Sequence, residues 1–257
     1  MAIIGIENIS FSYNGGLVLN KVSDSIASGE FIGITGPNGS GKTTLMRCMN
    51  GILKPREGKI LLDNENISGF SPRRLAKKIA YLPQTFENIF PSTVFDTVLM
   101  GRKPYLGWAP SKKDLDITSE IIIKLDLSEI ILKDINKLSG GQRQRVFIGR
   151  ALAQEPSVIL LDEPTANLDL HHQHEVMALL QELSKKGITV IIAIHDLNLA
   201  MQYCSRFLML NEGKIAANGR HEIFKPDLIE KVYKVKVNIF EDEQKNKFII
   251  PIKASQS

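Results

Sequence analysis

The sequence predicts an α/β fold with a mainly parallel sheet, an antiparallel strand layer near the N-terminus and a helical insertion. Apolar, strand-sized runs alternate with helical periods around residues 30–50 and again after residue 156, which is typical of a parallel core. Short alternating segments with Asn and Gly turns occupy residues 2–26 and 58–67, and these favour the antiparallel layer. Between Ser92 and Lys137 strand signals disappear and helical patterns replace them.

The individual elements follow in chain order. "EFIGITG" at residues 30–36 predicts a buried strand that runs directly into a helix after Gly41. Inside the helical insertion, Ser92 and Ser111 are expected to be N-caps, because a serine hydroxyl accepts a hydrogen bond from a free N–H group of the first turn.

The core resumes after the insertion. "PSVILLDEP" at residues 156–164 and "GITVIIAIH" at residues 187–195 predict buried strands, with a helix between them from about His171 and a short strand at residues 207–210. After Gly219 a helix followed by a small hairpin is expected.

Composition limits the class of protein. The chain has 257 residues, 43% of them hydrophobic, which is enough for a packed interior. No apolar run approaches the ~20 residues that cross a bilayer, and the start of the chain does not resemble a signal peptide, so a cytoplasmic location is expected. The two cysteines, Cys48 and Cys204, have no metal-ligand spacing and are predicted to be buried and inert. A net charge of +4 with scattered basic residues argues against nucleic acid as a partner.

A phosphate-binding loop is the clearest chemical motif. "GPNGSGKTT" matches the pattern G-x-x-x-x-G-K-[ST] and lies between a predicted strand and a predicted helix, where its mechanism requires it. Backbone N–H groups of the loop would surround the β-phosphate, Lys42 would reach the β- and γ-phosphates, and Thr43 would ligate Mg²⁺. The residues predicted to line this site are Gly36, Pro37, Asn38, Gly39, Ser40, Gly41, Lys42, Thr43 and Thr44.

Two adjacent acids end the strand in "VILLDEP". Asp162 is suited to hold Mg²⁺ and Glu163 to polarise the water that attacks the γ-phosphate. Neighbouring side chains of an extended strand point in opposite directions, which supports separate roles. The alternative is a strand end with two solvated acids.

Two further polar residues follow strands of the core. Gln84, in "YLPQ", stands just before the insertion, where its amide would contact the metal or the attacking water and pass that state on to the insertion. His195 ends the strand "VIIAIH" and would bond the γ-phosphate, although a core or capping role is the alternative. Asp196 is expected to cap the next helix.

A second anion site is indicated by "KLSGGQRQRV". Ser139 precedes two glycines and a helix, and a helix N-terminus attracts negative charge. One domain with two anion sites and one magnesium site is best used as half of a symmetric pair.

Two patterns are ambiguous. Tyr13, before a Gly turn, would stack on adenine or simply pack against its neighbours, and the sequence does not separate these alternatives. His171, His172, His174 and Glu175 look like a metal cluster, but nothing supplies a second arm of ligands, so a metal site there is not expected.

In this order, "GPNGSGKTT", "YLPQ", "LSGGQRQRV", "VILLDEP", "NLD" and His195 resemble the ATP-binding cassette family, the ATPase subunits of membrane transporters. The resemblance implies an active, P-loop ATP hydrolase. Its ATPase domain would be residues 1–224, with a helical insertion at about 85–153 that docks on a membrane subunit. A helix-hairpin extension would follow at residues 225–257.

The resemblance also implies a head-to-tail pair of cassettes, in which the signature of one copy closes on the ATP of the other. Gln84 becomes the Q-loop residue and joins Thr43 and Asp162 at the magnesium, and Tyr13 becomes the adenine-stacking aromatic. His195 becomes the switch histidine. The residues that would reach the partner's nucleotide are Ser139, Gly140, Gly141, Gln142 and Asp169.

The branch of the family is indicated by "VLMGRKPYLGW" and "NLDLHHQHEV", which resemble importers of ferric siderophores, haem and cobalamin. Such importers use a separate permease and a substrate-binding protein, which places the ATPase at the inner face of the membrane. The alternatives are another importer or an exporter, for zinc, manganese or another small solute. A non-transport ATPase of the superfamily fits less well, because the interval between the motifs is too short for an inserted coiled coil.

Overall fold

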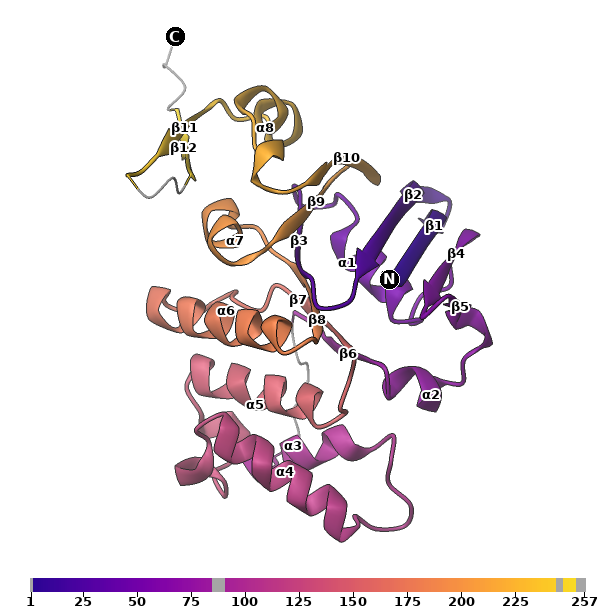
Figure 1. Ribbon diagram of the computed structural model, residues 1–257, viewed down its shortest axis with the longest axis vertical. Coiled ribbons are helices and arrows are strands. Elements are labelled where there is room, and N and C mark those ends of the chain that lie inside the picture. Colours follow the sequence, from indigo (N-terminus) through magenta and orange to yellow (C-terminus); the bar gives the residue numbers. More distant parts are fainter. Residues whose placement is uncertain (1, 85–90, 244–246, 253–257) are drawn as a thin grey trace. The chain divides into compact units, whose positions relative to one another are not determined.

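The computed structural model describes residues 2–84, 91–243 and 247–252 (Figure 1). The chain forms two compact units. Unit 1 contains Met1–Ser68 and Ile191–Ser257, and unit 2 contains Gly69–Val190. The predicted α/β class, with a parallel-rich sheet and an antiparallel layer, is confirmed.

Unit 1 begins with an antiparallel sheet in the order β2-β1-β4-β5. Its strands are β1 (Ala2–Tyr13), β2 (Gly16–Ala27), β4 (Glu57–Leu62) and β5 (Glu65–Asn66). Ile6 pairs with Asp24 on one side and with Ile60 on the other, and the buried residues of β1 include Ile4 and Ile9. The predicted antiparallel layer is therefore confirmed.

The second sheet of unit 1 has the order β10-β9-β3-β8. β3 (Phe31–Thr35) is buried along its whole length and pairs in parallel with β9 (Arg206–Asn211), which pairs antiparallel with β10 (Lys214–Gly219). β8 (Thr189–Ala193) begins in unit 2 and ends in unit 1. The helices α1 (Lys42–Met49) and α7 (Leu197–Tyr203) follow β3 and β8 along the chain. This arrangement makes β3 lead directly into the glycine loop.

The C-terminal part of unit 1 contains the predicted helix and hairpin. These are α8 (Pro226–Tyr233), preceded by a 3₁₀ turn at His221–Ile223, and the strands β11 (Val237–Glu241) and β12 (Lys247–Pro251). The hairpin is attached to α7 by Asn198, whose Nδ2 donates to Ile249 O (3.1 Å) and whose Oδ1 accepts from Ile249 N (2.8 Å).

In unit 2 the neighbouring strands follow the order β8-β7-β6, and β6 (Ile79–Leu82) and β7 (Val158–Asp162) are parallel. All five residues of β7 are buried. The long helix α6 (Leu170–Lys185) follows β7 and begins one residue before the predicted position. Its N-cap is Asp169.

Helices fill the rest of unit 2. They are α2 (Pro72–Ala76), α3 (Val94–Leu99), α4 (Lys112–Lys124) and α5 (Gly140–Leu152), with 3₁₀ turns at Met100–Arg102, Ser128–Ile130 and Ile135–Lys137. A further 3₁₀ turn, Ile67–Gly69, spans the boundary between the units. In Figure 1, α3, α4 and α5 lie side by side, and α3 contacts both of the others. The predicted start of the insertion at Thr85 lies outside the described residues.

The two predicted caps of the insertion had different outcomes. Ser111 caps α4 as expected, through a capping box with Asp114. The prediction of Ser92 was wrong, because Thr93 caps α3 and its Oγ1 accepts from Asp96 N (3.1 Å). Ser92 and Thr93 are both hydroxyl residues, and only the observed helix start at Val94 decides between them.

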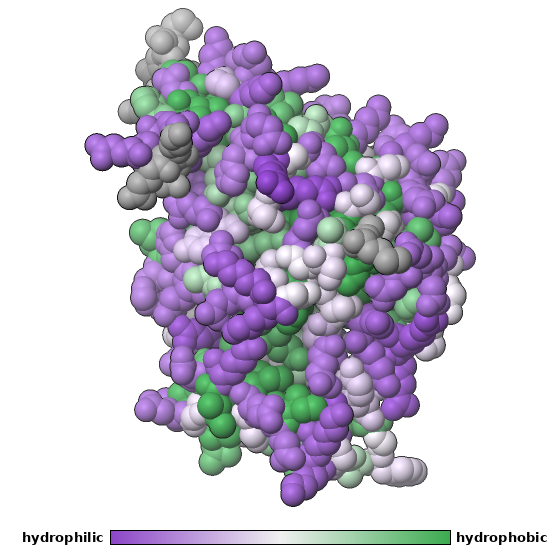
Figure 2. Space-filling view, viewed as in Figure 1, coloured by the Kyte–Doolittle hydropathy of each residue, from purple (hydrophilic) through white to green (hydrophobic). Residues whose placement is uncertain are grey.

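The surface drawn in Figure 2 is mostly hydrophilic, with smaller hydrophobic areas between the polar side chains. Among the residues that the structure describes, no helix is both long and apolar enough to span a membrane. Both cysteines are buried, as predicted. Burial raises the pKa of Cys48 to about 12 and also raises that of Cys204, which keeps both thiols protonated.

Candidate functional site

The phosphate loop in unit 1 depends on three glycines with positive φ. These are Gly36 (139°), Gly39 (77°) and Gly41 (105°), in a backbone region that L side chains rarely adopt. A Cβ added to Gly36 would lie 2.2 Å from Leu210 O, so space as well as conformation requires glycine there. The loop therefore follows a backbone path that few other sequences allow, and such glycine loops let N–H groups approach a phosphate closely.

Two side chains of the loop are positioned for anion binding. Lys42 is almost fully buried, and its Nζ donates to Gly36 O (2.8 Å) and Pro37 O (3.0 Å). The buried hydroxyl of Ser40 makes no hydrogen bond within the described residues. A buried donor without a partner is rare in proteins, and a phosphate oxygen would satisfy it. The loop and the side chains present therefore fit a nucleotide phosphate.

The end of β8 brings His195 toward the same part of unit 1. Ile194 N donates to Ile34 O (3.1 Å), which places the end of β8 beside the end of β3, the strand that enters the loop. His195 follows as an exposed residue. Asp196 caps α7 as predicted, with its Oδ1 accepting from Leu199 N (2.9 Å).

Tyr13 ends β1 and is 45% exposed, with its ring edge-on to Phe11 at 4.8 Å. The face of the Tyr13 ring is thus partly exposed, which is compatible with stacking on adenine and with packing against neighbouring residues.

The acid pair lies at the end of β7 in unit 2. Asp162 is buried, and Tyr81 donates its hydroxyl to Asp162 Oδ2 (3.4 Å). Glu163 leaves the strand with φ +53°, and Gln84 Nε2 donates to Glu163 Oε2 (2.5 Å). The structure therefore brings Gln84 and Glu163 together, although they are 79 residues apart in the sequence.

The predicted second anion site lies at the start of α5 in unit 2. Ser139 Oγ accepts from Gln142 N, and Gln142 Oε1 accepts from Ser139 N, both at 3.3 Å. This reciprocal capping box orders the first turn, which contains Gly140 and Gly141. The backbone N–H and the side-chain oxygen of Gln142 are therefore both used in the helix cap.

The segment before α6 is ordered by Asp169. Its Oδ1 accepts from His172 N (2.9 Å) and lies 2.7 Å from His172 Nδ1. These bonds, the backbone one first, lower the pKa of Asp169, so its carboxyl group stays ionised. The sequence identified Asp169 but not the contacts that His172 makes.

The histidine-rich start of α6 is not arranged as a metal centre. In the described part of the chain, no group of three or more His, Cys, Asp or Glu residues is placed to hold a metal ion. Glu175 instead accepts from Arg145 at 2.6 Å, with His171 Nε2 at 3.4 Å.

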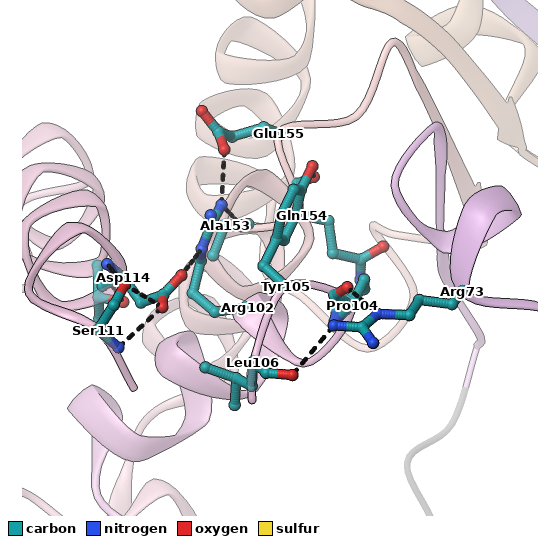
Figure 3. Close-up of polar contacts among 11 residues, drawn as sticks. Arg73, Arg102, Pro104, Tyr105, Leu106, Ser111, Asp114, Ala153, Gln154 and Glu155 are labelled. Atoms are coloured by element: carbon teal, nitrogen blue, oxygen red, sulfur yellow. Dashed lines mark hydrogen bonds and ion pairs between the residues drawn. The ribbon is translucent and has the colours of Figure 1, made fainter. Parts of the chain in front are cut away.

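A buried arginine explains the "GRKPYLGW" stretch, for which the sequence offered no physical reason. Figure 3 shows Arg102 donating through Nε to Asp114 Oδ1 (2.9 Å) and through one terminal nitrogen to Ala153 O (2.7 Å) and Glu155 Oε2 (2.8 Å). Burial disfavours its charge, but the bonds to Glu155 and Asp114 outweigh this and raise its pKa. Arg102 therefore ties together the start of α4 and the end of α5.

The neighbouring residues continue this framework. Tyr105 stacks on the Arg102 guanidinium, at 4.0 Å from the ring centre, and donates its hydroxyl to Gln154 O (3.0 Å). Arg73 of unit 2 holds the backbone on both sides of Tyr105 by donating to Pro104 O (2.7 Å) and Leu106 O (3.1 Å), as Figure 3 shows. The segment thus held ends near the fully exposed Trp108.

Comparison with known families gives these motifs a context. A sequence model described as ABC transporter matches residues 19–166, which include the phosphate loop, the second anion site and the acid pair. The chain belongs to the ABC transporter family. As a member of this family, the chain is a nucleotide-binding ATPase.

Relatives of this ABC protein match over nearly its whole length. It is 44% identical to an uncharacterised ABC transporter ATP-binding protein of Methanocaldococcus jannaschii, over 91% of this chain and 92% of the relative. It is 35% identical to a petrobactin import ATP-binding protein of Bacillus anthracis, over 95% and 91%. Other matched relatives are named for the import of hemin and of cobalamin.

Solved structures agree with the fold of this ABC protein. A chain of a metal-chelate type ABC transporter in an inward-facing conformation aligns with a TM-score of 0.85 and 27% identity, covering 100% of this chain and 99% of that one. A dimeric cassette in a post-hydrolysis state with ADP and phosphate aligns with a TM-score of 0.75 and 32% identity, covering 84% and 98%. The predicted resemblance to cassettes of metal-chelate importers is confirmed at the level of sequence and fold.

Proposed function

We propose that this ABC protein is the ATP-hydrolysing subunit of an importer that takes up a metal chelate through a separate permease. The cargo class is a ferric siderophore, haem or cobalamin. The single observation that carries the proposal is that one chain combines a glycine loop with positive φ angles and a helix that begins at a capping box, two constructions that suit anion binding. Relatives matched over nearly the whole chain, and named for petrobactin and hemin import, support the cargo class.

The two anion sites suggest how the subunit works. In a head-to-tail pair, ATP held by the phosphate loop of one copy meets Ser139, Gly140, Gly141 and Gln142 of the other, with Asp169 beside them. The dimeric cassette with ADP and phosphate supports such pairing. Closure of the pair moves the insertion, about residues 85–153 of the ATPase domain 1–224, and through it the permease. The extension 225–257 follows this domain.

Each side chain has a proposed task at the nucleotide. Tyr13 stacks on adenine, and Gly36, Pro37, Asn38, Gly39, Ser40, Gly41 and Thr44 surround the phosphates. Lys42 and His195 stabilise negative charge on the γ-phosphate, and Glu163 orients the attacking water. The amide of Gln84 donates to Glu163, which holds its carboxylate in one direction.

A magnesium ion fits the donor set of the chain. Thr43, Gln84 and Asp162 offer hydroxyl, amide and carboxylate oxygens, the hard ligands that Mg²⁺ prefers. The ion would supply positive charge next to the phosphate oxygens. The other expected partners are a second copy, the permease at the inner face of the membrane and, through it, a substrate-binding protein.

The metal content of cells supplied only with chelated metals tests the cargo. Cell iron and cobalt are measured in a strain without this chain, with each metal offered only as a ferric siderophore, haem or cobalamin. Loss of one supply, restored by the wild-type chain and not by Lys42→Ala, is expected. An unchanged supply of all three would overturn the metal-chelate assignment and favour another importer or an exporter.

Light scattering with MgATP tests the pairing. Glu163→Gln is expected to be dimeric with MgATP, because it removes the group that orients water and leaves nucleotide binding intact. Ser139→Arg, which places a bulky side chain in the second anion site, is expected to bind MgATP as a monomer. A monomeric Glu163→Gln that still binds nucleotide would contradict the head-to-tail pair.

A further inference from the structure

The two glycines of the second anion site lie against the first turn of α6 and the segment that precedes it. A Cβ added to Gly140 would lie 3.2 Å from Leu168 Cδ2, and one added to Gly141 would lie 2.1 Å from His172 Cδ2. The second distance is far below any real carbon–carbon contact. Neither glycine is among the positive-φ glycines of the chain. Gly141 is therefore required by the space that the His172 ring occupies and not by its backbone conformation.

The opposite side of the same ring is held by Asp169. Its Oδ1 lies 2.7 Å from His172 Nδ1, and the lowered pKa of Asp169 means that this carboxylate can only accept a hydrogen bond. Nδ1 must therefore carry the hydrogen and donate it. The ring is fixed between Asp169 on one side and Gly141 on the other.

Neighbouring bonds stiffen this arrangement. Gln173 Nε2 donates to Leu168 O (3.1 Å) and Thr165 O (3.4 Å), which ties the first turn of α6 to the segment before it. One turn further along, Arg145 of α5 pairs with Glu175 of α6 at 2.6 Å. Of the titratable groups in the described part of the chain, Asp169 and His171 have contacts to the ring, the His171 ring centre lying 5.4 Å from that of His172.

Helix capping alone does not account for the ring. The cap of α6 needs a bond from the backbone N–H of residue 172 to Asp169, which most residues at that position would supply. The contact with Gly141 needs a bulky, flat side chain that also donates toward Asp169. The imidazole of His172 meets both conditions.

We propose that His172 is a positioning residue that holds Gly141 and Asp169 as one rigid body, so that both reach the nucleotide of the partner copy in a single fixed geometry. The inference rests on the proposed head-to-tail pair. It assigns to His172 a part in closing the dimer without contact to the nucleotide bound by its own chain.

The test uses the full chain in the Glu163→Gln background with MgATP. His172→Ala is expected to raise the dissociation constant of the dimer about tenfold, because the two elements then move separately. His172→Asn keeps a donor toward Asp169 but loses the ring, and should weaken the dimer to an intermediate degree. MgATP affinity of the monomer and the midpoint of thermal unfolding should change little. His171→Ala, one residue away on a 77% exposed side chain, is the matched control and should leave the dimer unchanged.

A double variant tests the contact itself. Gly141→Ala introduces a methyl group into the His172 ring and is expected to abolish the dimer. The double variant, Gly141→Ala with His172→Ala, lacks the ring. Its dimer should be about as tight as that of the single His172→Ala variant. Such a rescue distinguishes a direct contact from two independent defects.

Two results would overturn the inference alone: a dimer of His172→Ala as tight as its parent, or a Gly141→Ala defect that His172→Ala does not relieve. A Glu163→Gln parent that binds MgATP but forms no dimer would overturn the proposed pairing and this inference with it.

Discussion

The phosphate loop of unit 1 and the second anion site of unit 2 both use glycine, but for different physical reasons. In the loop, Gly36, Gly39 and Gly41 have positive φ, so the backbone path itself demands glycine. At the start of α5, Gly140 and Gly141 lie in an ordinary helix, and the His172 ring occupies the place where a Cβ of residue 141 would lie. A glycine required for conformation is a local property of the chain. A glycine required for space depends on residues that folding brings beside it.

The segment around Arg102 in the insertion differs from both glycine sites, because ion pairs and hydrogen bonds of a charged side chain hold it in place. Its polar contacts join Arg102 to residues 12 to 53 positions away. Unlike the phosphate loop, this framework depends on the ionisation of a carboxylate, and it therefore responds to pH.

The largest effect is expected where conformation and space both demand glycine. Gly36→Ala should lower the free energy of unfolding by more than ~4 kcal/mol and abolish nucleotide binding, because its Cβ meets Leu210 O at 2.2 Å and its φ is +139°. Urea unfolding and nucleotide titration measure both. Gly107→Ala, with no atom within 4 Å of its Cβ and no positive φ, is the control. Equal stability of the two variants would refute the conformational argument.

The next largest effect is expected at the buried ion pair of Arg102 and Asp114. Arg102→Met should cost about 3–5 kcal/mol of unfolding free energy, because it leaves Asp114 buried without its charged partner. Lys103→Met, at the exposed neighbouring position, should change stability little. If the two variants unfold at the same urea concentration, Arg102 does not support the segment.

The same framework predicts a dependence on acid. The Ser111 hydroxyl, followed by the Arg102 guanidinium, lowers the pKa of Asp114 to about 2. A group with a depressed pKa stabilises the fold above its ordinary value, near pH 4, and this contribution is lost as the pH falls through about 2. Asp114→Asn should therefore be less stable than the wild type at neutral pH, with the difference shrinking below pH 4. A constant difference from pH 7 to pH 2.5 would exclude this origin.

The smallest effect is expected where conformation alone demands glycine. Gly39 has φ +77° and no atom within 4 Å of its Cβ position, so Gly39→Ala should cost only about 1–2 kcal/mol. Thermal unfolding measures this cost. A loss as large as that of Gly36→Ala would mean that the loop cannot tolerate a side chain even in open space.

Predictions that depend on nearby residues were accurate for the fold. The strands that flank the phosphate loop and acid pair, the antiparallel layer and the cap of α4 by Ser111 follow from local patterns. The cap of α3 was misplaced by one residue, since Ser92 and Thr93 offer the same hydroxyl. Local sequence cannot separate two equivalent caps when tertiary packing decides where the helix starts.

The contacts of the candidate site were less predictable. The sequence identified Gln84 and Glu163 as separate functional residues, but the 2.5 Å contact between them depends on the parallel pairing of β6 and β7. Similarly, "GRKPY" stood out as a pattern without a reason until Arg102 was seen to bridge α4 and α5. The histidines after Asp169, where no metal site was expected, include His172, whose ring lies against Gly141.

The sequence by itself determined the α/β class, the phosphate loop and the acid pair, because each depends on backbone conformation or hydrophobic period within a short stretch of chain. It also carried the resemblance to the family, because the motifs follow one another in the order typical of that family. Only the tertiary structure decided why Gly141 is glycine, what Arg102 holds and which group Gln84 meets. These properties arise from side chains that come together across tens of residues, where packing and charge pairing act between elements and leave no periodic signal in the sequence.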